Sequence, residues 1–155
     1  MAVQYLAKWG CDVTAVSSSR DTEEQARELG AKHIVATRGT DESQKAAGSF
    51  DFIFSTVSGD LPWDEYLAAL RPQGKLCLIG IPESRVSFGA FAPMGGEKSI
   101  VGGPTRSPSD TAAVLAFTAR HGIKPMIETF PMSDADRALD YTRAGKARFR
   151  AVLVA

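Results

Sequence analysis

The stretch DFIFSTVSGDLPWDEYLAALRPQGKLCLIGIP, residues 51–82, holds two short apolar runs separated by a helical pattern. The runs Phe52–Phe54 and Leu76–Ile79 do not alternate with polar residues, which is typical of strands that are buried on both faces. Between them, Trp63–Leu70 predicts a helix that stops at Arg71–Gly74. A strand, a helix and a second strand in this order predict parallel pairing through a right-handed crossover.

The same alternation of helices and strands continues on both sides of this stretch. Ser107 and Ser133 stand where side-chain caps would begin the last two helices. Strands separated by helices predict the α/β fold class, with a parallel sheet that carries helices on both faces. The elements expected outside the opening stretch are, in chain order, helix 1–9, strand 12–16, helix 21–29, strand 33–36, helix 41–47, loop 83–97, strand 99–102, helix 107–120, strand 126–130, helix 133–145 and strand 149–154.

The beginning of the chain departs from the usual order of such folds. A doubly wound nucleotide-binding domain opens with a strand, a Gly-rich turn and a helix, whereas this sequence begins with the helical pattern at 1–9 and has no Gly-x-Gly-x-x-Gly near its start. We therefore expect a Rossmann-like, doubly wound, mostly parallel sheet that lacks its first strand and Gly-rich turn. That strand would lie between the strands at 12–16 and 51–57, so we expect these two to pair directly or another chain to fill the gap.

Composition and charge exclude several classes of protein. The 155 residues carry 18 Lys+Arg and 18 Asp+Glu, so the zero net charge argues against nucleic acid as a partner. No apolar run reaches the roughly 20 residues of a membrane span and no targeting signal is visible, so we expect no membrane partner and a cytoplasmic location. Cys11 and Cys77 predict two buried thiols rather than a disulfide. With only His33 and His121 as histidines, no metal site is expected within this chain.

Polar donors follow the predicted strand at 12–16, at the edge where open parallel sheets bind ligands. Ser17, Ser18, Ser19 and Arg20 offer three hydroxyls and a guanidinium, which is a donor set that suits a phosphate. In a dinucleotide site this position meets the adenosine ribose, and no acid stands between the end of this strand and Asp21. The alternative interpretation is that the serines only cap the helix that begins near Asp21.

Three other strand ends carry small, hydroxyl-bearing or apolar residues. Such residues let a flat ligand approach the backbone, whose N–H and C=O groups can bind a carboxamide. Strand ends also carry glycine and proline simply to turn the chain. We find no catalytic constellation in the sequence, and the histidines are interpreted as structural. The candidate residues at these three strand ends are Thr56, Val57 and Ser58, then Gly80, Ile81 and Pro82, and then Ile100, Val101 and Gly102.

Six stretches, in chain order, resemble medium-chain alcohol dehydrogenases. The first is similar to the segment that follows the family's Gly-rich turn, and the last is similar to the family's C-terminus. The most similar branch is the cinnamyl-alcohol-dehydrogenase-like one, whose members are zinc-dependent and prefer NADP. The three serines at 17–19 also favour this branch. The stretches that carry the resemblance are Met1–Thr14, Glu28–Val35, Phe50–Val57, Leu70–Leu76, Leu78–Pro82 and Arg143–Arg150.

The resemblance implies that this chain is the C-terminal portion of a zinc-dependent alcohol dehydrogenase. Residues 1–124 would be a partial NADP-binding domain, and 125–155 a tail that in the family returns to the catalytic domain. The resemblance assigns residues 17–20 to the 2′-phosphate of NADP, 56–58 to the ribose, 80–82 to the nicotinamide side and 100–102 to the carboxamide. The family's zinc ligands have no counterpart here, so the resemblance implies zinc in the full-length protein only, and no catalytic residue in this chain.

Two functional hypotheses follow from these observations. The first is part of an NADP-dependent dehydrogenase that transfers hydride between a small alcohol or aldehyde and the nicotinamide. By itself such a chain would bind NADP weakly or not at all and would be inactive. The second is a non-catalytic nucleotide-binding or oligomerising module. Because related dehydrogenases dimerise through the edge strand that Ser99–Gly102 resembles, we expect a homo-oligomer in either case.

Overall fold

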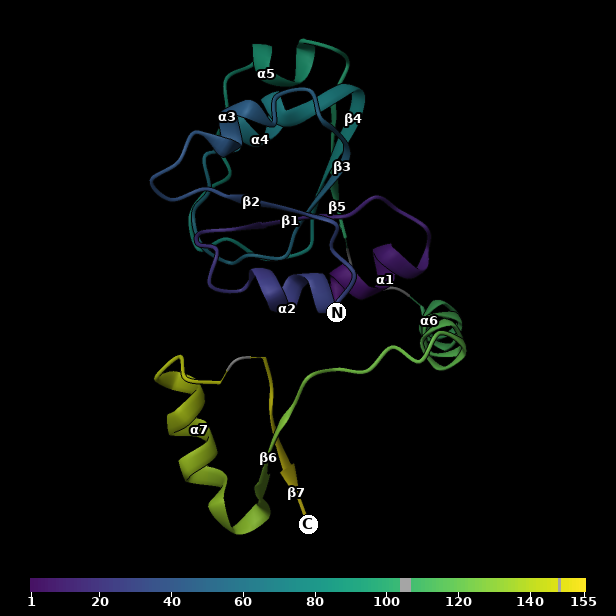
Figure 1. The fold of residues 1–155 in the computed structure, drawn as a ribbon, viewed down its shortest axis with the longest axis vertical. Helices are drawn as coiled ribbons and strands as arrows, with labels where there is room; N and C mark the ends of the chain where they lie inside the picture. The colour runs from purple at the N-terminus through teal and green to yellow at the C-terminus, as the bar shows by residue number, and fades with distance from the viewer. Residues whose placement is uncertain (104–106, 148) are drawn as a thin grey trace.

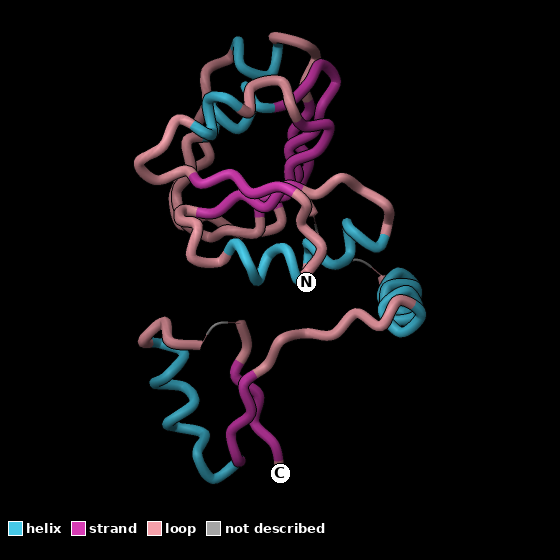
Figure 2. The backbone as a smooth tube through the Cα atoms, in the orientation of Figure 1, coloured by secondary structure: helices cyan, strands magenta, loops and turns pink. Residues whose placement is uncertain are grey.

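The computed structural model describes residues 1–103, 107–147 and 149–155. Its strands form separate parallel sheets with the orders β1-β2, β3-β4-β5 and β6-β7, which Figure 2 shows in magenta. The α/β fold class with parallel strands is thus confirmed. The strands are β1 (Thr14–Ser17), β2 (His33–Ala36), β3 (Phe50–Ser55), β4 (Leu70–Leu78), β5 (Ser99–Gly102), β6 (Glu128–Pro131) and β7 (Ala151–Val154).

Seven α-helices alternate with these strands in the described residues. The last of them, with β6 and β7, lies at one end of the molecule, away from the other two sheets (Figure 1). The helices are α1 (Ala2–Lys8), α2 (Glu23–Glu28), α3 (Glu42–Lys45), α4 (Trp63–Ala69), α5 (Phe91–Met94), α6 (Pro108–Arg120) and α7 (Ala135–Arg143), the last preceded by a 3-10 turn at Met132–Asp134.

Local sequence signals account for where several helices begin and end. The Ser107 hydroxyl accepts a hydrogen bond from the backbone N–H of Asp110, and Pro108 occupies the first helical position of α6, as predicted. Gly10 and Gly122 follow α1 and α6 with φ of 86° and 62°, left-handed angles that favour glycine at a helix end. The cap expected from Ser133 is wrong, because α7 begins after Asp134 and has no side-chain cap.

The hydrophobic core lies between α4 and one face of the three-stranded sheet. Trp63 and Leu67 of α4 pack with Leu70 and Leu76 of β4, and all four are at most 5% exposed. Partly buried side chains from β3, β5 and α5 surround this cluster. The register of the sheet is regular at its carboxyl end, where Ser55 pairs with Leu78 and Leu78 pairs with Gly102.

The expectation that the strands at 51–57 and 75–81 are buried on both faces is wrong. Phe52 is 53% exposed and Phe54 is 37% exposed, whereas Ile53 between them packs on the core. Ile79, directly after β4, is 48% exposed. In the described residues the core helices cover one face only, so side chains that alternate to the other face meet solvent. The Phe52 and Phe54 rings stack on each other there, with centroids 6.3 Å apart.

Direct pairing of the strands at 12–16 and 51–57 is also wrong. β1 pairs only with β2, and β3 pairs only with β4, so the two strands belong to different sheets. Each keeps an edge that no strand of the described residues occupies, and Val16 of β1 remains 40% exposed. Whether another chain fills the gap stays a prediction.

Other expectations about individual residues meet mixed outcomes. Both cysteines are free, but Cys11 is exposed and Cys77 is only half-buried, so the prediction of two buried thiols is wrong. Trp9 is 67% exposed, and the centroid of its ring lies 5.6 Å from that of Phe117. The loop expected at 83–97 contains the short helix α5.

Among the described residues, no helix has the length and apolar character needed to cross a membrane.

Candidate nucleotide site at the strand ends

The carboxyl ends of β3, β4 and β5 lie side by side at one edge of their sheet. This follows from the register, in which Ser55, Leu78 and Gly102 stand in one row. The candidate segments 56–58 and 80–82 begin just beyond this row, and 100–102 forms the end of β5 itself. The structure therefore brings three of the four candidate segments to one edge.

The loops that leave β3 and β4 are held together by backbone hydrogen bonds. The N–H groups of Ile79 and Gly80 both donate to the Ser55 carbonyl, each at 2.9 Å, and the Glu83 N–H donates to the Ser58 carbonyl at 3.2 Å. A β-carbon built on Gly80 would lie 2.3 Å from the Val57 carbonyl oxygen. Only glycine fits at this point, so the edge is closely packed.

The surface of this edge is apolar and open. Val57 is 47% exposed, and Ile81 is 82% exposed, although both follow apolar strands. Next to them, the Gly103 N–H donates to the Leu78 carbonyl at 2.8 Å, which ties the end of β5 to β4. Exposed apolar side chains beside accessible backbone form the kind of surface on which a flat ring can stack.

The fourth candidate segment, 17–20, lies at the end of β1 in the other sheet. Its serines are partly engaged: the Ser19 hydroxyl donates to Asp21 Oδ2 at 2.9 Å, and Thr22 Oγ1 donates to the Ser17 hydroxyl at 3.4 Å. The helix-cap interpretation of the serines is not met, because α2 begins at Glu23 with Thr22 at its N-cap and no side-chain cap. Ser18 is exposed.

Arg20 is paired with two carboxylates in this structure. Its Nη1 lies 2.8 Å from Glu23 Oε2 on α2, and its Nη2 lies 2.6 Å from Glu42 Oε1 on α3. These contacts raise the pKa of Arg20 further, with Glu42 as the larger cause. The second Glu42 oxygen accepts the N–H of Ala36 at 2.8 Å. That hydrogen bond, and then the Arg20 guanidinium, hold the pKa of Glu42 below its ordinary value.

Sequence reasoning missed Glu42 as a member of this site. The sequence indicated no acid at the end of β1 before Asp21, yet α3 brings Glu42 to Arg20 across 22 positions. The available signal was its place in the chain: it follows β2, the strand that a parallel crossover puts beside β1. An acid at the end of a neighbouring strand reaches the same edge.

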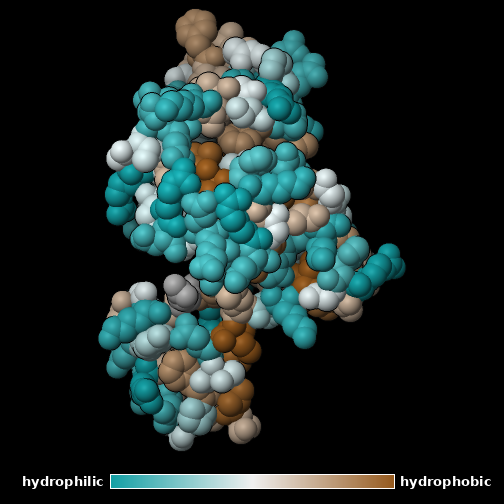
Figure 3. Space-filling view, in the orientation of Figure 1, coloured by the Kyte–Doolittle hydropathy of each residue, from teal (hydrophilic) through white to brown (hydrophobic). Residues whose placement is uncertain are grey.

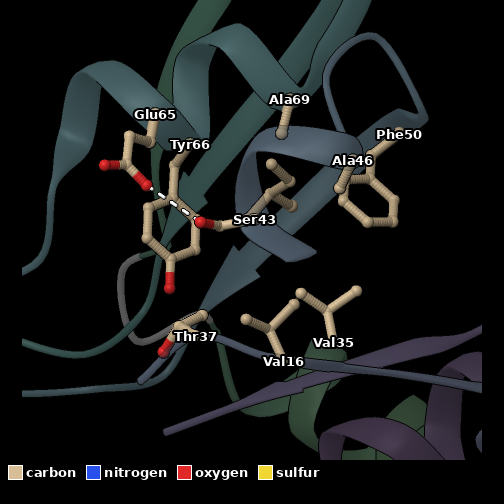
Figure 4. A pocket seen from close by; sticks show the side chains of 10 residues that line it. Val16, Val35, Thr37, Ser43, Ala46, Phe50, Glu65, Tyr66 and Ala69 are labelled. Carbon is tan, nitrogen blue, oxygen red and sulfur yellow. Dashed lines mark hydrogen bonds between the residues drawn. The ribbon is translucent and has the colours of Figure 1, made fainter. Parts of the chain in front are cut away.

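A hollow lies between the β1-β2 sheet and the β3-β4-β5 sheet. Val16 and Val35 point into it from one side, and Phe50, Tyr66 and Ala69 line the other (Figure 4). Ser43 on α3 donates to Glu65 Oε2 of α4 at 3.1 Å and links the helices across it. The space-filling view shows apolar surface inside a recess among polar side chains on the face in view (Figure 3).

A second, more open hollow extends along β1, β2 and α3. Arg20, Glu42 and Lys45 line it, together with residues of the two strands. In the part of the chain that the structure describes, no group of three or more His, Cys, Asp or Glu could hold a metal ion. The chemistry available at these edges is thus anion binding at Arg20 and ring and amide contacts beyond β3 to β5.

Comparison with known families gives a match over most of the chain. The family described as zinc-binding dehydrogenase matches residues 1–120. An aldehyde reductase of Synechocystis sp. is 37% identical over 153 residues, which cover 99% of this chain and 46% of the relative. An NADP-dependent alcohol dehydrogenase C of Mycobacterium tuberculosis is 35% identical, with 99% of this chain and 44% of the relative covered. The chain thus spans less than half the length of these relatives.

Solved structures give the same picture. A cinnamyl alcohol dehydrogenase from Sorghum bicolor matches with a TM-score of 0.90 and 30% identity over 99% of this chain and 44% of that one. A cinnamyl alcohol dehydrogenase from Helicobacter pylori in complex with NADP(H) matches with a TM-score of 0.84 and 27% identity, with the same two coverages. The separate sheets described above therefore correspond to parts of a Rossmann-like fold.

Proposed function

Because the chain belongs to the zinc-binding dehydrogenase family, we propose that it supplies most of the NADP-binding half of an alcohol or aldehyde dehydrogenase. In this proposal, residues 1–124 are the partial cofactor domain and 125–155 the tail that packs on a catalytic domain. Zinc would be held by that other domain in the longer protein. This chain contributes binding and positioning groups, and it holds no catalytic residue.

The observation that carries the proposal is the shared edge beyond β3, β4 and β5. Gly80 lets the loops after β3 and β4 pack closely, because a β-carbon there would lie 2.3 Å from the Val57 carbonyl oxygen, and this contact holds together the edge that the cofactor would approach. At the neighbouring sheet, Arg20 and three serine hydroxyls form a donor set for a 2′-phosphate. The residues present therefore fit NADP.

Each segment has a distinct task in the proposed site. Arg20, with Ser17, Ser18 and Ser19, binds the 2′-phosphate. Thr56, Val57 and Ser58 lie along the ribose, Gly80, Ile81 and Pro82 orient the nicotinamide side, and the backbone of Ile100, Val101 and Gly102 binds the carboxamide. When bound, NADP supplies the nicotinamide ring that accepts or donates a hydride. The apolar side chains at this edge exclude water from one face of the ring.

Titration calorimetry of the chain with NADPH and NADH tests the proposal. We expect weak binding of NADPH, in the high micromolar range, because helix N-termini with Gly-rich turns usually anchor the pyrophosphate and none begins this sequence. Charge-assisted hydrogen bonds to the 2′-phosphate should favour NADPH over NADH by at least about tenfold in the longer protein. Arg20→Ala should remove most of that preference and leave NADH binding nearly unchanged.

Arg71→Ala provides the matched control. Arg71 is as exposed as Arg20, at 52% against 53% of its side chain, and it also pairs with a carboxylate, that of Asp51. It stands at the opposite, amino end of the β3–β4 pair. Equal loss of NADPH and NADH binding in Arg20→Ala would contradict the proposed role and make Arg20 structural. Turnover of an alcohol by the chain alone, with or without zinc, would contradict the proposal that this chain binds the cofactor while another domain supplies the catalytic groups.

The exposed apolar residues of the sheet favour a second candidate function. Phe52, Phe54 and Val101 are 53%, 37% and 41% exposed on the three-stranded sheet, and such surfaces commonly mark association sites. A non-catalytic, oligomerising module would use them for contacts between chains. Failure to bind either nucleotide, together with stable oligomers in light scattering, would favour this function over the first.

A further inference from the structure

The acids around Arg20 are not equivalent. Glu23 sits on α2 and is shared with Arg27, whose guanidinium lies 2.8 Å from the other Glu23 oxygen. Glu42 sits on α3 and reaches Arg20 from a different element. If Arg20 turns toward another anion, Glu23 therefore keeps a strong partner on its own helix.

Glu42 is anchored independently of Arg20. Its Oε2 accepts the backbone N–H of Ala36 at the end of β2, at 2.8 Å. Its own N–H donates to the Thr40 hydroxyl at 3.3 Å, in the turn that leads into α3. The Glu42 side chain is 26% exposed, about half the exposure of Arg20. Its carboxylate consequently stays at the Arg20 fork even when the guanidinium moves.

A phosphate that binds Arg20 must therefore meet this carboxylate. The guanidinium uses Nη1 for Glu23 and Nη2 for Glu42, so both arms of the fork are engaged. A phosphate needs one of those arms for a bidentate contact, and a fixed negative charge beside it repels it. A 2′-hydroxyl carries no charge and avoids this repulsion.

We propose that Glu42 sets the discrimination between nucleotides with and without a 2′-phosphate, because its carboxylate competes for Arg20 and limits the preference for NADP. This inference rests on the proposed function of Arg20 and concerns the same site. Glu42 is a positioning residue, since it acts through the guanidinium. The serine hydroxyls at 17–19 would still bind the phosphate.

Two nucleotides that differ only in the 2′-phosphate provide the readout. Adenosine 2′,5′-bisphosphate carries it and AMP does not, and each is titrated calorimetrically into the full chain. Glu42→Gln keeps the length of the side chain and an oxygen that can accept the Ala36 N–H. We expect it to strengthen binding of the bisphosphate about three- to fivefold, the range of an exposed ion pair. AMP binding should not change.

Asp41→Asn is the matched control. It removes the same charge from the neighbouring position, but Asp41 pairs with Lys45 at 2.9 Å and not with Arg20. We expect no change in the ratio of the two affinities. If Glu42→Gln lowers the helical signal in circular dichroism, Glu42→Met, which is also uncharged and of similar length, replaces it.

The double variant separates a role through Arg20 from a structural one. In an Arg20→Ala background, Glu42→Gln should leave the affinity ratio unchanged. A ratio that rises equally in both backgrounds, or that does not rise in Glu42→Gln alone, overturns this inference while Arg20 keeps its proposed role. If Arg20→Ala itself does not alter the ratio, or if no variant binds either nucleotide at millimolar concentration, the proposed function of the site fails instead.

Discussion

A β-carbon on Gly80 would stand 2.3 Å from the carbonyl oxygen of Val57, so the backbones that follow β4 and β3 touch each other. Both groups are backbone, and neither can swing aside as the end of a flexible side chain could. We therefore expect Gly80→Ala to lower the free energy of unfolding by about 1–3 kcal/mol, as overpacking usually does. Urea unfolding at equilibrium measures this change.

Gly59→Ala is the control for that experiment. A β-carbon there would have Val57 Cγ1 as its nearest neighbour, at an ordinary contact distance of 3.8 Å. Its effect should stay within about 0.5 kcal/mol. Equal stabilities of the two variants would show that the loops separate easily and would weaken the case for a rigid edge.

The core of the molecule depends on α4. Leu67 is completely buried against the three-stranded sheet, so we expect Leu67→Ala to destabilise the chain by about 2–5 kcal/mol. Leu115 on α6 is 63% exposed, and Leu115→Ala should change stability by less than about 0.5 kcal/mol. Thermal and urea unfolding of both variants, followed by circular dichroism, test this difference.

Acid should remove the contribution of Glu42 to stability. The Ala36 N–H, and then Arg20, lower the pKa of Glu42 below its ordinary value of 4.5. The stabilisation is therefore complete above pH 4.5 and is lost as the pH falls through the lower, folded value. The difference in unfolding free energy between the native chain and Glu42→Gln should shrink well below pH 4.5; a difference that grows there would contradict the contacts described.

The two thiols should react at different rates. Cys11 is exposed and Cys77 is half-buried, and burial raises the pKa of the Cys77 thiol. Since the thiolate is the reactive form, an aromatic disulfide reagent should modify Cys11 quickly and Cys77 slowly in the native state. Cys11→Ser should abolish the fast phase and Cys77→Ser the slow one. A single fast phase with both thiols would contradict the burial of Cys77.

Self-association should involve the free edge of β5. In the described residues that strand pairs with β4 on one side only, and Val101 within it is 41% exposed. We expect a dimer or larger species in light scattering, and a shift toward monomer in Val101→Lys, because a lysine on an edge strand disfavours pairing. Val114→Lys on α6, where Val114 is 50% exposed, is the control. A monomer at tens of micromolar in the native chain would contradict this prediction.

The sequence by itself determined the order and type of most elements, with the short helix α5 in the expected loop at 83–97 as an exception. Caps and stops are local, so Ser107 with Pro108 marked the beginning of α6, and Gly10 and Gly122 marked helix ends. Parallel pairing followed from the alternation of strands and helices. The loops after β3 and β4 leave the same edge of the sheet, because parallel strands end on the same side. The family resemblance rested on such stretches as well.

Only the tertiary structure decided which side chains are covered and which distant ones meet. The apolar runs predicted that Phe52 and Ile79 are buried, but burial depends on which face of the sheet the core occupies, and these side chains are 53% and 48% exposed. The contact between Arg20 and Glu42 joins the loop after β1 to the helix after β2. No periodicity encodes such a pair, because it arises from the crossover that places two strand ends together in space.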